Sequence, residues 1–137
     1  MTLSTTTVDA LRDLQQVAWQ NSEDKGFHDN EPTGAAELAI YNGNRLMLIV
    51  SEAAEALEEI RAGRSASETY YPDAPKDSHA ERPEPGRYKP EGVPSELADI
   101  VIRCFDFAGS NGFDLGQIIQ EKLTYNRSRE RMHGKRF

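Results

Sequence analysis

The spacing of apolar residues limits the fold of this chain more than any other feature. Between residues 46 and 60, apolar side chains recur at alternating intervals of four and three, namely Leu46, Val50, Ala53, Leu57 and Ile60. This spacing places them on one face of an α-helix. Comparable patterns occupy residues 4–22, 95–112 and 113–137, and no segment alternates as a half-buried strand would. The sequence therefore predicts an all-α, four-helix-bundle-like fold.

Capping residues predict where these helices begin and end. Hydroxyl residues at positions 4–7 suit the start of the first helix, while Ser95 and Asp114 suit the starts of the last two. Gly63 is expected to end the second helix, and Gly109 with Gly112 the third. Gly43 lies inside the second helical pattern, where it is expected to kink or divide the helix.

Residues 65–94 lack this helical pattern. They hold six of the seven prolines and show no apolar period, so we expect a long irregular insertion between the second and third helices. Such long loops in compact domains are usually functional or disordered. The length of 137 residues suits a single domain, 1–137, that carries this insertion.

Composition excludes several classes of partner. A net charge of −7 argues against binding a nucleic-acid backbone, which needs a basic surface. Cys104 is the only cysteine, so no internal disulfide is expected and a reducing compartment fits. The longest apolar run, LMLIV, is far too short to span a membrane, and the first residues do not resemble a signal peptide. We expect a cytoplasmic protein without membrane partners, with Cys104 as a buried inert thiol.

Two helices carry acidic residues on the face opposite their apolar residues. Glu52, Glu55 and Glu59 share one sector of the second helix, and Glu96 and Asp99 share a face of the third. Like charges at this spacing repel unless a cation lies between them, and Mg²⁺ prefers such oxygen ligands. The alternative is a pair of solvated outer faces, which is the commoner explanation for any single motif of this kind. A carboxylate-bridged di-iron site needs two Glu-x-x-His motifs, and only residues 130–133 match.

The last helix carries a polar stripe that suits phosphate binding. Lys122, Asn126 and Arg129 are spaced i, i+4 and i+7, so they lie along one face, and His133 and Lys135 follow in the tail. Lys and Arg provide charge for phosphate, and Asn can contact a base or sugar edge. Cations near a helix C-terminus also complement its dipole, but Lys122 lies too far from the end for that explanation. His28 and His79 lie in loops without evident partners and are expected to be solvent residues.

Several motifs, taken in order, resemble a known superfamily. KGF, SEAAEALEEIR, ELADIVIRCFD, DLGQIIQEKLTYNRSR and HGKRF occur in sequence and cover most of the chain outside its start and the Pro-rich insertion. Together they resemble the all-α nucleoside triphosphate pyrophosphohydrolases, closest to the short MazG-like members. Each motif alone is weak, whereas their order is quite specific.

The resemblance implies a metal site and a reaction. The signature of the family is EExxE followed by ExxD; Ser51 replaces the first Glu, and the matching positions are Glu52, Glu55, Glu96 and Asp99. In such enzymes Mg²⁺, or Mn²⁺ in its place, bridges carboxylates and triphosphate, and water cleaves the α–β bond to give a nucleoside monophosphate and pyrophosphate. Glu52 or Glu55 would accept the proton of that water. The replacement at position 51 leaves the number of metal ions open.

The resemblance also implies substrate contacts and an oligomer. Lys122 and Arg129 would hold phosphate oxygens, and Asn126 and Trp19 would contact base or sugar, although Trp19 suits a core or dimer interface equally well. Members of the family complete their site from more than one subunit, which implies a homodimer or homotetramer. A non-catalytic helical module that senses nucleotides or binds a partner is the alternative. The preferred base, triphosphate versus diphosphate, and a role in nucleotide-pool housecleaning stay open.

Overall fold

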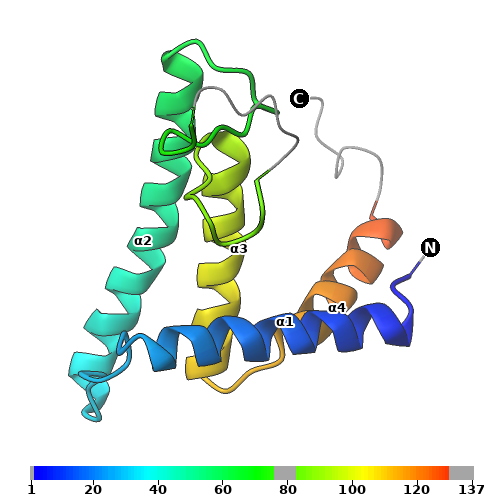
Figure 1. Cartoon of the computed structure of the whole chain (residues 1–137). Coiled ribbons are helices and arrows are strands. Elements are labelled where there is room, and N and C mark those ends of the chain that lie inside the picture. The colour runs from blue at the N-terminus through cyan, green and yellow to red at the C-terminus, as the bar shows by residue number, and fades with distance from the viewer. Residues whose placement is uncertain (1, 76–82, 130–137) are drawn as a thin grey trace. The chain divides into compact units, whose positions relative to one another are not determined.

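The computed structural model describes residues 2–75 and 83–129 and is all-helical over this part of the chain (Figure 1). It has four helices, α1 (Thr5–Asp24), α2 (Ala35–Arg61), α3 (Val93–Ser110) and α4 (Leu115–Ser128). Within these ranges the only β-type pairing is an isolated antiparallel bridge between Tyr70 and Glu91. The predicted all-α class and the four helices are confirmed over these ranges. None of the described helices is both long and apolar enough to cross a membrane.

The chain divides into two compact units, each described here by itself. The terminal unit combines Met1–Glu31 with Phe105–Phe137, and the central unit comprises Pro32–Cys104. The terminal unit therefore holds α1, α4 and the last turn of α3, while the central unit holds α2, the Pro-rich insertion and most of α3.

A small apolar core holds the terminal unit together. Val8, Ala18, Phe105 and Ala108 are buried there, and α1 packs against α4. Gly109 allows the end of α3 to approach α1, because a Cβ at this position would lie 2.7 Å from the Cβ of Trp19. Burial of apolar surface at this close contact stabilises the unit.

Most of the predicted helix ends are confirmed. Ser4 accepts a hydrogen bond from the backbone N–H of Thr7 at 3.1 Å, and Asp114 accepts one from Gln117 at 2.8 Å, so both act as N-caps. Gly63, with φ of 85°, follows α2 in the left-handed conformation typical of a helix C-terminus. Gly43 does not divide α2, which is continuous.

The predicted N-cap at Ser95 is wrong, because α3 begins earlier, at Val93. Pro94 occupies the first turn, where a helix needs no N–H and the fixed φ of proline is suitable. The hydroxyl of Ser95 instead donates to the carbonyl of Pro90 at 2.9 Å, which ties the insertion to the start of α3.

The central unit reverses the expected direction of its helix faces. α3 runs antiparallel to α2, and the side chains between them include Glu52 and Glu96, each only 6% exposed (Figure 1). Val50 of the expected core face is 54% exposed, and Leu97 of α3 is 51% exposed. The expectation that these apolar faces form the core of the chain is therefore wrong for the central unit. An ion pair between Arg103 and Glu52 joins the two helices on their inward faces, and the apolar faces lie outward.

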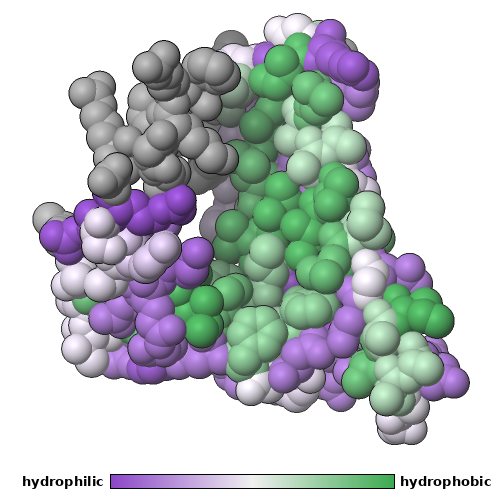
Figure 2. All heavy atoms as spheres, turned by 180° about the vertical axis from the view of Figure 1, so that it is seen from behind, coloured by the Kyte–Doolittle hydropathy of each residue, from purple (hydrophilic) through white to green (hydrophobic). Residues whose placement is uncertain are grey.

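We call the exposed apolar side chains of these two helices the apolar band. Figure 2 shows hydrophobic side chains gathered over this part of the molecule. The members of the band are Leu46, Met47, Leu48, Val50, Leu57, Ile60, Leu97, Val101 and Ile102. Single exposed apolar residues are ordinary, whereas a contiguous exposed apolar band is unusual on a single chain.

Candidate metal centre

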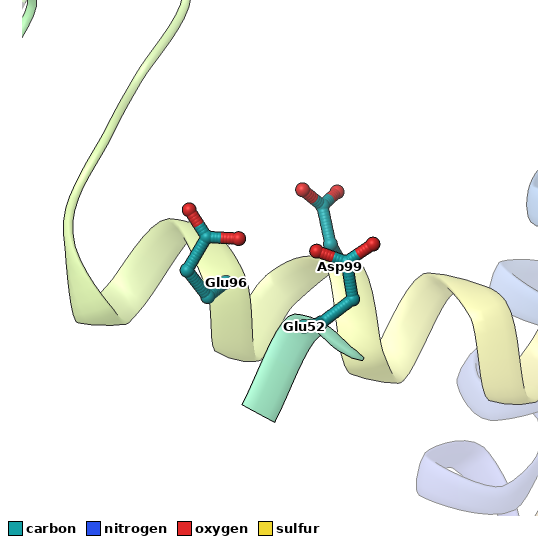
Figure 3. Close-up of side chains that lie close together, drawn as sticks. All are labelled: Glu52, Glu96 and Asp99. Carbon is teal, nitrogen blue, oxygen red and sulfur yellow. The ribbon is translucent and has the colours of Figure 1, made fainter. Parts of the chain in front are cut away.

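Three carboxylates from two helices converge in the central unit. Glu52 extends from α2, and Glu96 and Asp99 extend from α3 (Figure 3). One oxygen of each carboxylate lies within 4.8 Å of an oxygen of the others. We call this group the acidic cluster. It brings together three of the four predicted metal ligands.

Helix geometry explains why these side chains meet. Glu96 and Asp99 are three residues apart, so both project from one side of α3. Glu52 and Ala56 are the buried residues of α2 and, being four residues apart, define its inward face. The small side chain of Ala56 leaves room near the neighbouring helix, whereas the longer Glu52 reaches across to α3.

Two carboxyl groups of the acidic cluster, Glu96 and Asp99, have a raised pKa. Burial is the main cause that raises the pKa of Glu96 to about 7, and a hydrogen bond with Glu52 and the charges of Glu55, Glu52 and Asp99 add to it. Burial also raises the pKa of Asp99, followed by the charge of Glu52, while Arg103 and Lys89 act in the opposite direction. Glu96 is therefore largely protonated below neutral pH, and its proton joins it to Glu52.

Two cations partly compensate the acidic cluster. The Nε and Nη2 atoms of Arg103 both lie 2.7 Å from Oε1 of Glu52. Lys89, from the Pro-rich insertion, pairs with Glu91 at 2.7 Å. This ion pair is the main cause that raises the pKa of Lys89, and the charges of Glu96 and Asp99 also contribute. Sequence reasoning missed Lys89, although its place shortly before the ELAD motif was a usable signal.

The oxygen atoms of the acidic cluster fit a hard divalent cation. Mg²⁺ binds carboxylate oxygens at about 2.1 Å, so ligands on opposite sides of the ion are about 4.2 Å apart. Separations of up to 4.8 Å between the three carboxylates need only small side-chain rotations to reach this geometry. The donor set contains oxygen alone, without thiolate or imidazole, and this favours Mg²⁺ or Mn²⁺ over softer metals.

Glu55 and Ser51 lie outside this group. Glu55 is exposed and contributes no oxygen to the acidic cluster, although its charge is one of the causes that raise the pKa of Glu96. Ser51 is exposed, and its hydroxyl donates to the carbonyl of Leu48 in its own helix at 2.8 Å. Ser51 therefore serves its helix rather than the acidic cluster.

The terminal unit contains a second carboxylate group, built around His28. Nδ1 of His28 lies 2.9 Å from Oε2 of Glu23, and Nε2 lies 2.9 Å from Oδ1 of Asp106. Trp19 stacks on the imidazole with a centroid distance of 6.0 Å, and the His28 side chain is 6% exposed. The expectation that His28 is a solvent residue is wrong. Its partners come from α1 and α3, and neither lies at a spacing that the sequence would reveal.

The remaining predicted substrate residues belong to the terminal unit. Trp19 borders a cavity of about 460 Å³ that Arg12, Gln15 and Gln16 also line. Lys122 and Asn126 are exposed on α4, and Arg129 is the C-cap of that helix. Lys122 and Arg129 each lie 5.8 Å from the ring of Tyr125, which joins the stripe by cation–π contact. The tail residues His133 and Lys135, and the loop residue His79, lie outside the described residues.

Cys104 is partly buried, and burial raises the pKa of its thiol. A thiol with a raised pKa is a poor nucleophile at neutral pH, which agrees with an inert packing role. No protein-family model, curated protein or solved structure matches this chain.

Proposed function

We propose that this protein is a Mg²⁺-dependent nucleoside triphosphate pyrophosphohydrolase that cleaves the α–β phosphate bond to give a nucleoside monophosphate and pyrophosphate. The observation that carries the proposal is the convergence of Glu52, Glu96 and Asp99 within 4.8 Å, buried on one side and open to solvent at Asp99. The order of sequence motifs supplies the class of reaction.

Each member of the acidic cluster has a distinct part in holding the metal. Arg103 fixes the carboxylate of Glu52 through two bonds to one oxygen and leaves the second oxygen for the cation. Glu96 would release its proton when a cation binds, because the positive charge of the metal stabilises the ionised carboxylate. Bound Mg²⁺ would neutralise phosphate charge and lower the pKa of its water.

We assign the general base to Glu55. Glu52 is already engaged by Arg103 and by its hydrogen bond with Glu96, whereas Glu55 is exposed and lies near enough for its charge to act on Glu96. An exposed carboxylate beside the proposed metal centre can take the proton of the attacking water. Of the two candidates that the sequence offers, Glu55 is the better placed.

Each unit offers candidate residues for phosphate and nucleoside contacts. Lys89 is a cation of the central unit whose charge acts on Glu96 and Asp99, and it suits a phosphate oxygen. Lys122 and Arg129 would stabilise the charge that develops on the leaving pyrophosphate. Asn126 and Trp19 would contact base or sugar, and His133 and Lys135 of the tail would add further charge.

We further propose that the apolar band is covered by another copy of this chain, in a homodimer or homotetramer. Val50 and Leu97 are about half exposed in the single chain, and burying such side chains contributes roughly 1.5–3 kcal/mol each. Light scattering coupled to gel filtration would measure the mass in solution. A charge placed in the band by Val50→Asp should reduce that mass, whereas Glu58→Gln on the same helix should not.

Pyrophosphate release from a panel of ribo- and deoxynucleoside triphosphates, with Mg²⁺ and with EDTA, tests the proposed reaction. Metal-dependent release of pyrophosphate together with the monophosphate is the expected result. Orthophosphate as the product would show that another bond is cleaved. Absence of any product across the panel would contradict the proposed hydrolysis of these substrates.

A non-catalytic module that senses nucleotides or binds a partner is the second candidate. It is favoured by the position of Glu55 outside the acidic cluster and by the pairing of Arg103 with Glu52, which reduces the charge left for a metal. The variant Glu55→Ala separates the two functions. An enzyme would lose turnover while its metal binding persists, whereas a sensor would keep metal-dependent nucleotide binding and have no turnover to lose.

A further inference from the structure

The Pro-rich insertion forms a cavity against the side of α3. Its volume is about 420 Å³, within the range of small-molecule sites. The walls come from described parts of the insertion and from the first turns of α3: Thr69, Tyr71, Pro83, Glu84, Pro85, Gly86, Tyr88, Pro90, Pro94, Ser95, Ala98, Asp99 and Ile102. The cavity thus lies wholly within the central unit.

The walls of this cavity are anchored at their base. Tyr70 and Glu91 exchange two backbone hydrogen bonds, of 3.1 and 2.9 Å, which close the insertion. The Tyr70 hydroxyl bonds to Glu59 of α2 at 3.1 Å, and the Arg64 guanidinium lies 3.6 Å from the centre of the Tyr70 ring. These contacts fix both arms of the insertion to α2, so the cavity is largely formed before any ligand enters.

The lining suits a flat aromatic ligand. Tyr71 and Tyr88 provide aromatic faces, and prolines with Ala98 and Ile102 provide apolar walls. The Thr69 hydroxyl offers a polar contact for the edge of a ring. A mostly apolar pocket with a few polar groups is the usual environment of a heterocyclic ligand.

Asp99 joins this cavity to the acidic cluster. The α3 residues that line the cavity, from Pro94 to Ile102, lie on one side of the helix, and the face shared by Glu96 and Asp99 lies beside it. Asp99 is at the boundary and belongs to both sets. A ligand that fills both places therefore has a planar apolar end and an anionic, metal-binding end, and a nucleotide has this chemistry.

We propose that this cavity is the nucleobase-binding pocket, in which Tyr71 and Tyr88 stack on the base while the phosphates lie at the acidic cluster. The inference rests on the proposed function for the position of the phosphates. It assigns base recognition to the Pro-rich insertion, a segment that none of the sequence motifs covers. This pocket replaces Asn126 and Trp19 as the proposed place of base recognition.

Equilibrium binding by titration calorimetry, with Mg²⁺ present, tests the pocket without relying on turnover. The ligands are nucleoside triphosphates with a non-hydrolysable α,β-imido link and inorganic triphosphate, which has no base. For Tyr88→Leu we expect nucleotide affinity to fall about tenfold or more, since stacking on one aromatic ring is worth roughly that factor. Affinity for inorganic triphosphate should be unchanged, and Tyr88→Phe should bind both ligands as the wild type does.

A second variant guards against a folding defect at Tyr88. Ala98→Phe fills the cavity from α3 without removing any anchor of the insertion, and it should weaken nucleotide binding while sparing inorganic triphosphate. Tyr41→Leu on α2, outside the walls of the cavity, is the matched control and should change nucleotide affinity by less than either pocket variant. Melting curves of each variant confirm that the chain is folded.

The outcomes separate the pocket from the proposed function. Equal affinity of the wild type for nucleotides and inorganic triphosphate, or equal loss of both ligands in the pocket variants, would overturn the pocket and leave the metal site standing. Unchanged nucleotide affinity in Tyr88→Leu and Ala98→Phe would do the same. A wild type that binds neither ligand with Mg²⁺ would overturn both proposals.

Discussion

In the terminal unit, an imidazole lies between two carboxylates, those of Glu23 and Asp106. In the central unit, three carboxylates lie close together, those of Glu52, Glu96 and Asp99. Both groups bring together carboxylates from two helices, and each contains a shielded carboxylate: the Asp106 side chain is 15% exposed, and Glu52 and Glu96 are each 6% exposed. At His28 each ring nitrogen lies 2.9 Å from a carboxylate oxygen, so both carboxylates have a polar partner that the chain itself provides. In the acidic cluster the compensating cations do not balance the carboxylates, and a proton on Glu96 takes up part of the difference.

A structural carboxylate group differs from a ligand site in the source of its partner. A buried carboxylate needs a partner of opposite charge, and the source of that partner indicates the role. Where the chain provides the partner, as at His28, the group holds helices together. Where the chain provides too little positive charge for its carboxylates, as at the acidic cluster, where the pKa of Glu96 rises to about 7, an external cation is the natural partner.

Removing an acid from the acidic cluster should have the largest effect. Asp99→Asn keeps the size of the side chain but removes a ligand charge, so we expect Mg²⁺-dependent pyrophosphate release to fall by about a thousandfold. Manganese binding, followed by electron paramagnetic resonance, should weaken in parallel. Glu58→Gln is the control, since Glu58 is exposed and pairs only with Arg61 in the part of the chain that is described. Full manganese affinity in Asp99→Asn would show that the acidic cluster does not bind the metal and would contradict the proposed difference between the two carboxylate groups.

Breaking the His28 group should cost stability rather than metal binding. His28→Ala removes an ion-pair partner and the stacking contact with Trp19, and we expect a loss of about 2–4 kcal/mol in the free energy of unfolding. Urea denaturation measures this loss. Manganese affinity of the folded variant should stay near the wild-type value, because every ligand belongs to the central unit. A matched loss of metal affinity without destabilisation would show that His28 serves the metal site.

The proton on Glu96 should make stability and metal binding respond to pH in opposite directions. The pKa of Glu96 is raised from 4.5 to about 7, so between these values the folded protein holds a proton that the unfolded chain has released. Stability of the metal-free protein should therefore fall as pH rises from about 4.5 to about 7. Metal affinity should rise over the approach to pH 7, because less proton has to be displaced.

The variant Glu96→Gln isolates this effect. It cannot ionise, so the stability of the metal-free protein above pH 7 should increase by roughly 1 kcal/mol, and the pH-dependent fall should become smaller. Thermal melting in EDTA at pH 6 and pH 8 provides the comparison. If wild type and Glu96→Gln respond to pH identically, the shared proton is not at Glu96.

Lys89 should give the smallest effect. Its side chain is 69% exposed, and ion pairs at such positions contribute less than about 1 kcal/mol. For Lys89→Gln we expect nucleotide affinity to fall two- to fivefold, with a larger difference at low salt than at high salt. Manganese affinity should change little. A loss as great as that of Asp99→Asn would place Lys89 among the central groups of the site.

Local signals in the sequence were sufficient for the helices and for most of their ends. The apolar spacing marks α1 to α4, and Asp114 and Gly63 mark ends because capping depends on neighbours along the chain. Ser95 failed because proline in the first turn permits an earlier start.

The direction of the helix faces could not be read from the sequence. Periodicity separates an acidic face from an apolar face on α2, but it does not state which one meets the neighbouring helix of the same chain. Likewise, spacing placed Glu96 and Asp99 together, while the pairing of Glu52 with Arg103 depends on how α2 and α3 pack. The His28 group is hidden for the same reason, since Asp106 is distant in sequence.

The bridge between Tyr70 and Glu91 closes the insertion, so its length and sequence can vary without affecting the helices. Gly92 allows the closing turn, with φ of 105° and with no room for a Cβ beside the carbonyl of Glu68. Because the ends are closed by backbone pairing, doubling the length between them adds only about 0.6 kcal/mol of loop-closure entropy. Selection can therefore rewrite residues 71–90 while the helices and their carboxylates remain in place. A chain of this design can change the lining of its cavity while the acidic cluster keeps its geometry.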